Sequence, residues 1–290
     1  MSKTKTWIIT GATAGLGAAL ARSALEAGEH VVGTARRLER FASLQERFAD
    51  RLLAVAHDVR DRDGAAGVVE QAVARFGGVD VLVNNAGVGQ VGAAEEIADA
   101  ALQDMLDQHL LGPAAFVRAV VPVMRAAGSG SIVQMSSQGG RISYPAVGSY
   151  SAGKFALEGW SEALSAEVAP FGIRVLIVEP SRFRTEFNAP GVPLTADARA
   201  DYESVTGAVR QELTTADGRQ EGDPVRAAAA IRQMVDDPEA PLRLPLGAEA
   251  VRNLTDAYER SLADARRWAH VSESADFPDV APAQRAFATT

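Results

Sequence analysis

The chain has 290 residues, 47% of them hydrophobic, which suits one large α/β domain or two small ones. A formal charge of -8 argues against nucleic acid or an anionic membrane as the main partner, and the lack of cysteine excludes disulfides and Cys-ligated zinc. The four histidines are scattered singly, so we expect no metal site. We also expect a cytoplasmic protein, because the first apolar run is too short for a signal peptide and no stretch approaches a membrane span.

Short apolar segments alternate with longer helical segments along the first half of the chain. We expect strands at residues 7–10, 30–34, 52–56 and 79–83, and helices at residues 15–22, 38–49 and 62–76. This alternation is typical of βαβ units, whose strands form a parallel sheet that helices cover on both faces.

The second half continues the pattern around one irregular segment. Strands are expected at residues 131–135, 173–178 and 242–246, and helices at 98–127, 149–168, 225–235 and 248–268. Gly112-Pro113 predicts a kink in the first of these helices. Residues 180–213 are broken by Pro190, Gly191 and Pro193, and a loop of this length is usually a functional lid or a disordered insert. No linker divides the chain, so we predict one domain over residues 1–290.

Three glycines stand at the first strand-to-helix turn, in the segment from Thr10 to Gly17. Glycines let backbone N–H groups approach a pyrophosphate, and the helix that follows carries partial positive charge at its amino terminus. The spacing is G-x-x-x-G-x-G, which differs from the G-x-G-x-x-G fingerprint. Tight packing alone is the other explanation for such a turn.

Tyr150 and Lys154 lie four residues apart, in a chain with 26 arginines and only three lysines. That spacing places both side chains on one helical face. A free phenol titrates near about 10, and a fixed ammonium nearby favours the phenolate, so the pair predicts a proton donor and acceptor usable near neutral pH. The alternative is a surface tyrosine beside a solvated lysine.

Together these motifs resemble the short-chain dehydrogenase/reductase family in order and spacing. The resemblance rests on the glycine turn, Asn84-Asn85-Ala86-Gly87 after the fourth strand, Ser137 thirteen residues before Tyr150, and Lys154 four residues after it. It implies a doubly wound, seven-stranded Rossmann sheet with the dinucleotide across the carboxyl ends of the strands. It also implies a cofactor-binding and catalytic core at residues 5–187, a substrate loop at 181–215, a C-terminal extension at 248–290, and a homodimer or homotetramer.

The resemblance further implies an oxidoreductase mechanism. Nicotinamide would supply hydride to a carbonyl, Tyr150 would give its proton to the oxygen, and Ser137 would hydrogen-bond that oxygen. Lys154 would lower the pKa of Tyr150 and bind the nicotinamide ribose. His109 stands where the family usually has an asparagine that holds a relay water, so it is either a proton carrier in place of that water or a buried histidine with a structural role.

The choice of dinucleotide depends on the end of the second strand. Ala35 stands where a carboxylate would repel a 2′-phosphate, and Arg36 and Arg37 follow it, so we expect NADP(H), unless both arginines only begin a solvated helix. Asp58 matches the position that contacts adenine, with helix capping as its alternative role. The cofactor-binding residues implied by the resemblance are Gly11, Thr13, Gly15, Leu16, Gly17, Arg36, Arg37, Asp58, Val59, Asn85, Ala86, Gly87, Tyr150, Lys154, Pro180, Ser181, Phe183 and Thr185.

Substrate is expected between Ser137, Tyr150 and the irregular segment, against Val88, Gln90, Gln138, Tyr144, Phe183 and Phe187. This largely apolar set suits a medium-sized ketone, aldehyde or quinone, or the matching alcohol. Arg182 and Arg184 would receive an anionic group or else be solvated. Two other functions stay open: an epimerase or dehydratase on the same scaffold, and a non-catalytic nucleotide sensor.

Overall fold

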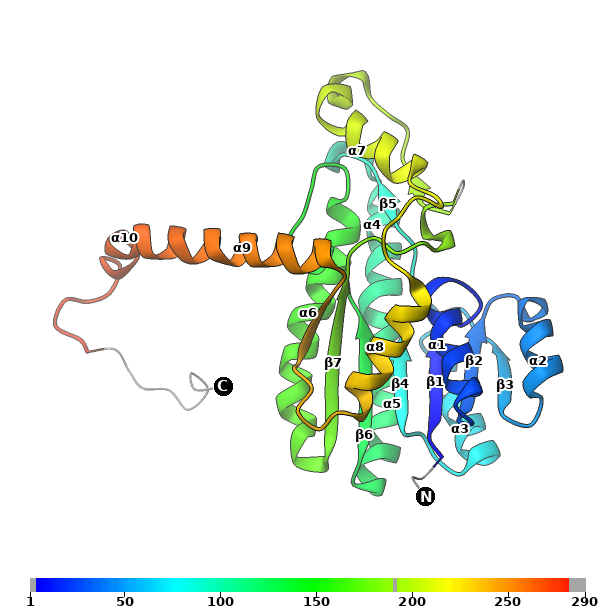
Figure 1. The fold of residues 1–290 in the computed structure, drawn as a ribbon. Coiled ribbons are helices and arrows are strands. Elements are labelled where there is room, and N and C mark those ends of the chain that lie inside the picture. Colours follow the sequence, from blue (N-terminus) through cyan, green and yellow to red (C-terminus); the bar gives the residue numbers. More distant parts are fainter. Residues whose placement is uncertain (1–3, 190–191, 282–290) are drawn as a thin grey trace.

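The computed structural model describes residues 4–189 and 192–281 and shows one parallel sheet between two layers of helices (Figure 1). Its main sheet contains β1 (Thr6–Thr10), β2 (His30–Ala35), β3 (Leu52–Ala56), β4 (Val81–Asn84), β6 (Gly130–Met135), β7 (Ile173–Pro180) and β9 (Arg243–Leu246). The helices are α1 (Gly15–Glu26), α2 (Ala42–Phe48), α3 (Gly64–Phe76), α4 (Asp99–Leu106), α5 (Gly112–Ala127), α6 (Gly148–Val168), α7 (Glu203–Thr215), α8 (Pro224–Asp236), α9 (Ala248–Arg267) and α10 (Ala269–Glu273).

The seven strands follow the order β3-β2-β1-β4-β6-β7-β9, and every neighbouring pair is parallel. The central strand β1 pairs Ile8 with Val32 on one side and with Leu82 on the other. The strand order therefore reverses between β1 and β4, and in such sheets a ligand crevice lies beyond the carboxyl ends at this reversal. The predicted doubly wound, seven-stranded sheet is confirmed.

The two faces of the sheet explain why its strands are apolar without alternation. Trp7 and Ile9 pack on the layer that contains α1 and α8, whereas Ile8 packs on the layer of α3, α5 and α6. All three side chains are almost fully buried. A strand with two buried faces needs apolar residues at consecutive positions, and each such side chain contributes about 1.5–3 kcal/mol.

The expected helix at residues 98–127 is interrupted, but earlier than Gly112-Pro113. A π-helical turn, Asp107–Leu111, separates α4 from α5, and Pro113 sits in the first turn of α5, where proline is tolerated. By length and composition alone, Asp99–Ala127 could cross a membrane, which corrects the prediction that no stretch approaches that length. In the fold 44% of that window is buried, and core helices of globular proteins pass the same test.

The segment after β7 is more regular than predicted. It contains β8 (Leu194–Thr195), which pairs with β5 (Gln90–Val91) in a second small sheet, and it ends in α7. Two-residue strands leave no periodic signal, and α7 has few apolar residues, which is why the sequence suggested a loop. Figure 1 shows α7 beyond the carboxyl ends of the strands. Pro190 and Gly191 lie outside the described residues.

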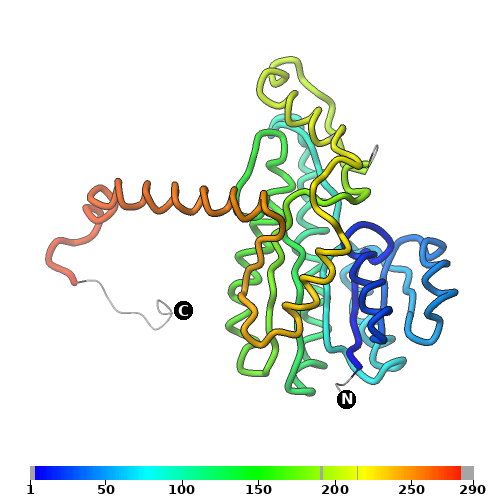
Figure 2. The backbone as a smooth tube through the Cα atoms, viewed as in Figure 1, coloured from blue at the N-terminus to red at the C-terminus, as the bar shows by residue number. Residues whose placement is uncertain are grey.

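The C-terminal helix α9 projects away from the sheet (Figure 2). Its buried residues, Ala250 and Leu254, are in its first two turns, where it leaves β9. The start of the predicted C-terminal extension is therefore in contact with the body of the fold, and residues 282–290 lie outside the described part of the chain.

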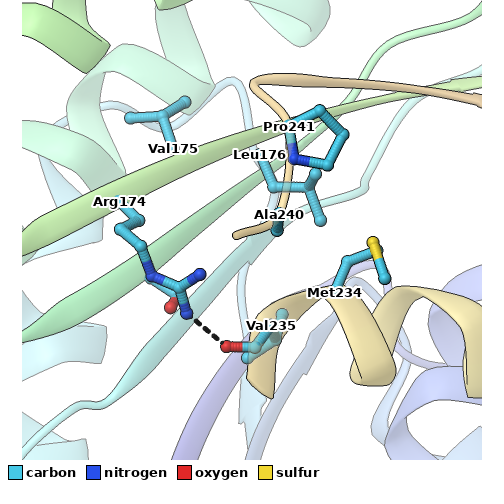
Figure 3. A pocket seen from close by; sticks show the side chains of 8 residues that line it. Arg174, Val175, Leu176, Met234, Val235, Ala240 and Pro241 are labelled. Carbon is cyan, nitrogen blue, oxygen red and sulfur yellow. Dashed lines mark hydrogen bonds between the residues drawn. The ribbon is translucent and has the colours of Figure 1, made fainter. Parts of the chain in front are cut away.

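A cavity of about 20 Å³ lies between the amino ends of β6 and β7 and the end of α8 (Figure 3). Arg174 on β7 donates to the carbonyl oxygens of Val235, at 2.5 Å, and Asp237, so it attaches the end of α8 to the sheet. The cavity has room for about one water molecule. It lies near the amino ends of β6 and β7, away from the carboxyl ends where such sheets bind ligands.

Candidate active site

The glycine turn is held open by backbone conformation and close packing. Gly11 and Gly15 have φ angles of 65° and 54°, which side chains with a Cβ rarely adopt. A Cβ on Gly17 would overlap Asn85 Nδ2 and the carbonyl oxygen of Gly11. Ala14, at the N-cap of α1, has no polar side chain. The first N–H groups of α1 are therefore suited to an anionic ligand such as a pyrophosphate.

The Asn84-Asn85-Ala86-Gly87 segment braces this turn at the reversal of strand order. Thr10 Oγ1 accepts hydrogen bonds from the backbone N–H groups of Asn85, at 2.9 Å, and Ala86, at 3.0 Å. Asn85 Nδ2 donates back to the carbonyl oxygens of Thr10 and Gly11. Asn84 Nδ2 donates to Gln134 Oε1 on β6 at 3.0 Å. Thr10 and Gln134 thus position the site; Thr10 belongs to the predicted glycine turn, whereas Gln134 carried no motif signal in the sequence.

Ser137 and Tyr150 meet beyond the end of β6. Ser137 Oγ accepts from the N–H of Gly139 at 3.0 Å, so its own proton is free to be donated, and it hydrogen-bonds the Tyr150 side chain. Ser136 faces elsewhere, because its Oγ lies 2.6 Å from where a Cβ on Gly140 would be. Of the two adjacent serines, Ser137 is therefore the one beside the tyrosine.

Burial sets the protonation of Tyr150 and Lys154. It raises the pKa of Tyr150 to about 12, against the hydrogen bond from Ser137, which lowers it. It also lowers the pKa of Lys154 to about 7, although Glu158 opposes this shift. Lys154 Nζ lies 5.8 Å from the Tyr150 ring centroid and donates to the carbonyl oxygen of Met135 at 2.6 Å. The expected acidified phenol is therefore wrong, because the burial that removes water from the phenol also weakens the charge on its lysine. Tyr150 instead stays protonated at neutral pH, the form that can donate a proton.

His109 is buried in the π-helical turn, against the Tyr150 ring at a centroid distance of 5.3 Å and an angle of 86°. Its Nε2 lies 2.9 Å from the carbonyl oxygen of Val88, and because a carbonyl only accepts, Nε2 carries the proton. Burial, and then Lys154, hold the pKa of His109 well below its ordinary value. Of the two roles considered from the sequence, this environment favours a neutral, buried imidazole.

The end of β2 leads into exposed arginines. Arg36 and Arg37 follow the buried Ala35 and lie at the surface. Asp58 is held by Arg60, whose Nε and Nη2 donate to its two carboxylate oxygens at 3.0 and 2.6 Å. These bonds lower the pKa of Asp58 to about 2. Its alternative role as a helix cap is wrong, because α3 begins at Gly64.

At that helix start, the N–H of Gly64 is bound by Asp61 Oδ1 at 3.1 Å. Of the other residues expected around the cofactor, Val59 is buried against Gly112, whereas Thr13 and Leu16 are half-buried in and after the glycine turn.

The segment after β7 lies against the glycine turn. Thr185 Cβ lies 3.4 Å from where a Cβ on Gly15 would be, so the two segments meet. Ser181, which follows Pro180 at the end of β7, donates its N–H to the carbonyl oxygen of Leu246 at 3.0 Å. The Phe183 ring packs in the hydrophobic core against Gly222. The structure therefore removes Phe183 from the predicted substrate wall.

The remaining candidate substrate residues form two groups. Phe187 lies over the tyrosine, with its ring centroid 6.1 Å from that of Tyr150. Gln138 and Tyr144 are instead bound by Asn253 of α9, whose Nδ2 donates to Gln138 Oε1 at 3.0 Å and to the Tyr144 hydroxyl at 3.4 Å. Asn253 was not among the predicted site residues, because one asparagine in a charged helix carries no sequence signal. The groove beside it, of about 330 Å³, is lined by Ile142, Ser143, Tyr144, Asn253, Asp256 and Arg260.

Other predicted residues are used by the fold itself. Gln90 is buried on β5. Arg182 pairs with Glu212 and lies 3.8 Å from Glu249, while Arg184 donates to the carbonyl oxygen of Gln220. Both arginines are therefore held by other groups of the fold, and neither is merely solvated. Within residues 4–189 and 192–281, no group of three or more His, Asp or Glu side chains could hold a metal ion.

Comparison with known proteins places this geometry in a family. A family profile described as short chain dehydrogenase matches residues 5–193. The chain is 35% identical over 272 residues to Oxidoreductase BOA17 of Botryotinia fuckeliana, covering 93% of this chain and 98% of that protein. It superposes with a TM-score of 0.90 on a short-chain dehydrogenase from Streptomyces avermitilis, at 45% identity, covering 95% of this chain and 100% of the other.

A more distant structure is the L-sorbose reductase from Gluconobacter frateurii, complexed with NADPH and L-sorbose. It is 29% identical, with a TM-score of 0.69, and the match covers 83% of this chain and 93% of that one. Solved relatives differ in their nucleotide, since another is complexed with NADH. The profile match, the close structural relative and the Ser137, Tyr150 and Lys154 arrangement agree, and the chain belongs to the short-chain dehydrogenase/reductase family.

Proposed function

We propose that the protein is an NADP(H)-dependent oxidoreductase that transfers hydride between nicotinamide and a carbonyl or alcohol of a medium-sized, largely apolar substrate. One observation supports this most strongly: Ser137 and Tyr150 lie side by side beyond the carboxyl end of β6, where Ser137 Oγ and Tyr150 Cε1 are each 3.3 Å from where a Cβ on Gly139 would be. Nicotinamide, when bound, would supply the hydride.

The side chains have distinct tasks in this proposal. Tyr150 gives its proton to the carbonyl oxygen, and the Ser137 hydroxyl turns from the tyrosine to the same oxygen, where it stabilises developing charge. Lys154, whose pKa is lowered to about 7, exists in both protonation states near neutral pH and so can resupply a proton. Phe187 provides an apolar wall above the Tyr150 ring.

The preference for NADP(H) rests on Arg36 and Arg37 at the exposed end of β2, where this chain has no carboxylate. Arg36→Asp should change the ratio of NADPH to NADH efficiency (kcat/KM) by at least about tenfold, because a guanidinium that binds a 2′-phosphate is replaced by a group that repels it. Arg47→Asp, on α2 and paired with Glu26, is the matched control and should leave the ratio unchanged. An unchanged ratio in Arg36→Asp would remove Arg36 from the site.

The substrate side combines apolar rings with a few polar groups. Tyr144 and Phe187 are 44% and 37% exposed, and Gln138 and Asn253 supply amides. A screen of ketones, aldehydes and quinones should find continuous oxidation of NADPH, with one reduced product for each NADPH consumed. Product formation without net NADPH consumption would favour an epimerase or dehydratase, and binding without turnover would favour a nucleotide sensor.

We also propose a homodimer or homotetramer. This is supported by exposed apolar side chains on two helices that are in contact: Leu102 on α4 is 38% exposed and Phe155 on α6 is 45% exposed. Light scattering on the parent and on Phe155→Asp tests this, and a monomeric parent would contradict it. The cytoplasmic location stays a prediction.

A further inference from the structure

A second group of buried charges lies one helical turn beyond Lys154. Glu158 on α6 and Glu179 on β7 have side chains that are 4% and 1% exposed. Both are close to Arg243 of β9, whose Nε lies 3.0 Å from Glu158 Oε2 and 4.0 Å from Glu179 Oε1. Three separate elements therefore bring two buried carboxyl groups to one guanidinium.

The cations near the pair do not satisfy both carboxylates. Arg243 also donates to Glu162 at the surface, at 2.7 Å, and Arg141 approaches Glu158 Oε2 only to 3.9 Å. Within the described part of the chain, Glu158 Oε1 and both oxygens of Glu179 find no hydrogen-bond donor. Of the four oxygens of the pair, only Glu158 Oε2 accepts a hydrogen bond, from Arg243, and two buried carboxylates with three unbound oxygens are unfavourable. A proton held between them removes one charge and supplies one donor.

The pair is connected to the catalytic helix. A Cβ on Gly140 would lie 2.6 Å from Ser136 Oγ, 3.0 Å from Glu158 Cγ and 3.2 Å from the carbonyl oxygen of Lys154, so these groups pack closely around Gly140. Glu158 is four residues after Lys154 on the same helical face and raises its pKa. The lysine and the pair are therefore electrostatically coupled.

We propose that Glu158 and Glu179 share one proton and act as a buried reservoir that resupplies Lys154 during turnover. This rests on the proposed function, in which each reduction removes one proton from Tyr150. The proton passes from Tyr150 to the product alcohol, Lys154 returns one to Tyr150, and the carboxyl pair returns one to Lys154. The pair is then reprotonated from water. No electrons move in these steps, and Glu158 and Glu179 are positioning residues that act through Lys154.

The charged and titratable groups facing the pair are Lys154 and Glu162 on α6, Arg141 after β6, Arg243 on β9 and Tyr258 on α9. Burial, and then the charge of Glu158, raise the pKa of Glu179 to about 7. The folded chain thus keeps a proton that the unfolded chain releases above its ordinary value of 4.5. Stability should fall as pH rises through about 7, and Glu179→Gln should reduce that fall.

The first test needs no turnover. The chain contains only three lysines, so an NMR titration of the protein labelled with 13C at the lysine Cε resolves Lys154. Glu158→Gln should lower the pKa of Lys154 by at least about half a unit, because it removes the carboxylate that raises it. Glu162→Gln, which removes the exposed partner of Arg243, is the control and should leave the titration unchanged. Identical Lys154 titrations in the parent, Glu158→Gln and Glu179→Gln would overturn the proposal.

The second test measures turnover with NADPH and 9,10-phenanthrenequinone as the carbonyl probe. Glu158→Gln and Glu179→Gln should each lower kcat by at least about fivefold with KM within about twofold, and should shift the alkaline limb of the kcat profile. Glu162→Gln should keep the parent kcat and profile. Parent-like profiles in both buried variants would overturn the reservoir. If the parent reduces no carbonyl in the screen, the proposed function fails, whereas the lysine titration still decides whether the pair is coupled to Lys154.

Discussion

The two sides of the candidate site, the glycine turn and the residues beyond β6, use different kinds of functional group. Around the glycine turn the functional groups are backbone N–H groups, glycines and the surface arginines Arg36 and Arg37. Beyond β6 they are titratable side chains: Lys154 and Glu158 are buried, and Tyr150 is half-buried.

The difference reflects what each side has to do. A pyrophosphate is recognised by the shape of the backbone, which depends on where glycines stand. Proton transfer depends on pKa values, which depend on burial. Lys154 shows the size of this effect, since its pKa moves from 10.5 to about 7. Substitutions that change the shape of the backbone should therefore have the larger effect at the glycine turn, and substitutions that remove an ionisable group should have the larger effect beyond β6.

The largest effect is expected on the side of the titratable groups. Tyr150→Phe removes the donated proton and keeps the ring that packs on His109 and Phe187, so kcat should fall by about 10²–10⁴-fold. The rate of NADPH oxidation measures this, and NADPH binding, followed by fluorescence, should stay close to the parent. Turnover as fast as in the parent would refute the role of the phenol.

On the side of the glycine turn, Gly17→Ala should weaken NADPH binding by at least about tenfold, because the new Cβ would overlap Asn85 Nδ2 and the carbonyl oxygen of Gly11. Calorimetry gives the Kd. The matched control is Gly67→Ala in α3, where a Cβ meets nothing within 4 Å. That variant should bind NADPH normally and gain about 0.5–1 kcal/mol in free energy of unfolding. Equal Kd values in the two variants would contradict the shape argument.

A smaller effect on activity is expected from Asn253 of α9, which binds two of the predicted substrate residues. Asn253→Ala removes the donor shared by Gln138 and Tyr144, which should raise KM for a carbonyl substrate by about three- to tenfold and change kcat less. Steady-state kinetics measure both constants. Thr255→Ala, two residues along α9, is the control. If KM stays the same in Asn253→Ala, α9 does not shape the substrate site.

The smallest effect on activity is expected at His109. Its imidazole is neutral, so neither limb of the pH–rate profile should move in His109→Asn. Stability should respond instead. The pKa of His109 is lowered in the folded chain, so below about pH 6.5 the unfolded chain binds a proton that the folded chain does not bind. The free energy of unfolding of the parent should therefore fall as the pH drops below that value. Denaturant unfolding should show a shallower fall in His109→Asn. A shifted kinetic limb would show that His109 carries a proton.

Much of the fold was predictable because its signals are local. The seven strands of the main sheet were each expected within a few residues, since strands buried on both faces are continuous apolar runs. The strands β5 and β8 and the helix α7 were missed because they are short or polar. The kink in the helix at residues 98–127 was expected at Gly112-Pro113, but the interruption is a π-helical turn that begins at Asp107, because Pro113 is compatible with a first helical turn.

The candidate site was predictable where spacing alone specifies it. Ser137, Tyr150 and Lys154 were found together because they lie on consecutive elements at fixed intervals. The acidified phenol and the substrate role of Phe183 were wrong, because both depend on how the side chains are buried. Spacing shows which residues are neighbours along the chain, but it does not show how far their side chains are buried, and burial shifts pKa values.

By itself, the sequence determined the parallel sheet, the glycine turn and the family, since these follow from apolar periodicity and motif spacing. The tertiary structure alone decided the protonation of Tyr150 and Lys154, the meeting of Glu158, Glu179 and Arg243, and the reach of Asn253 to Tyr144. The physical reason is that desolvation and charge pairing depend on distance in space, and folding brings together residues far apart in the chain, such as Asn253 and Tyr144, which are 109 positions apart.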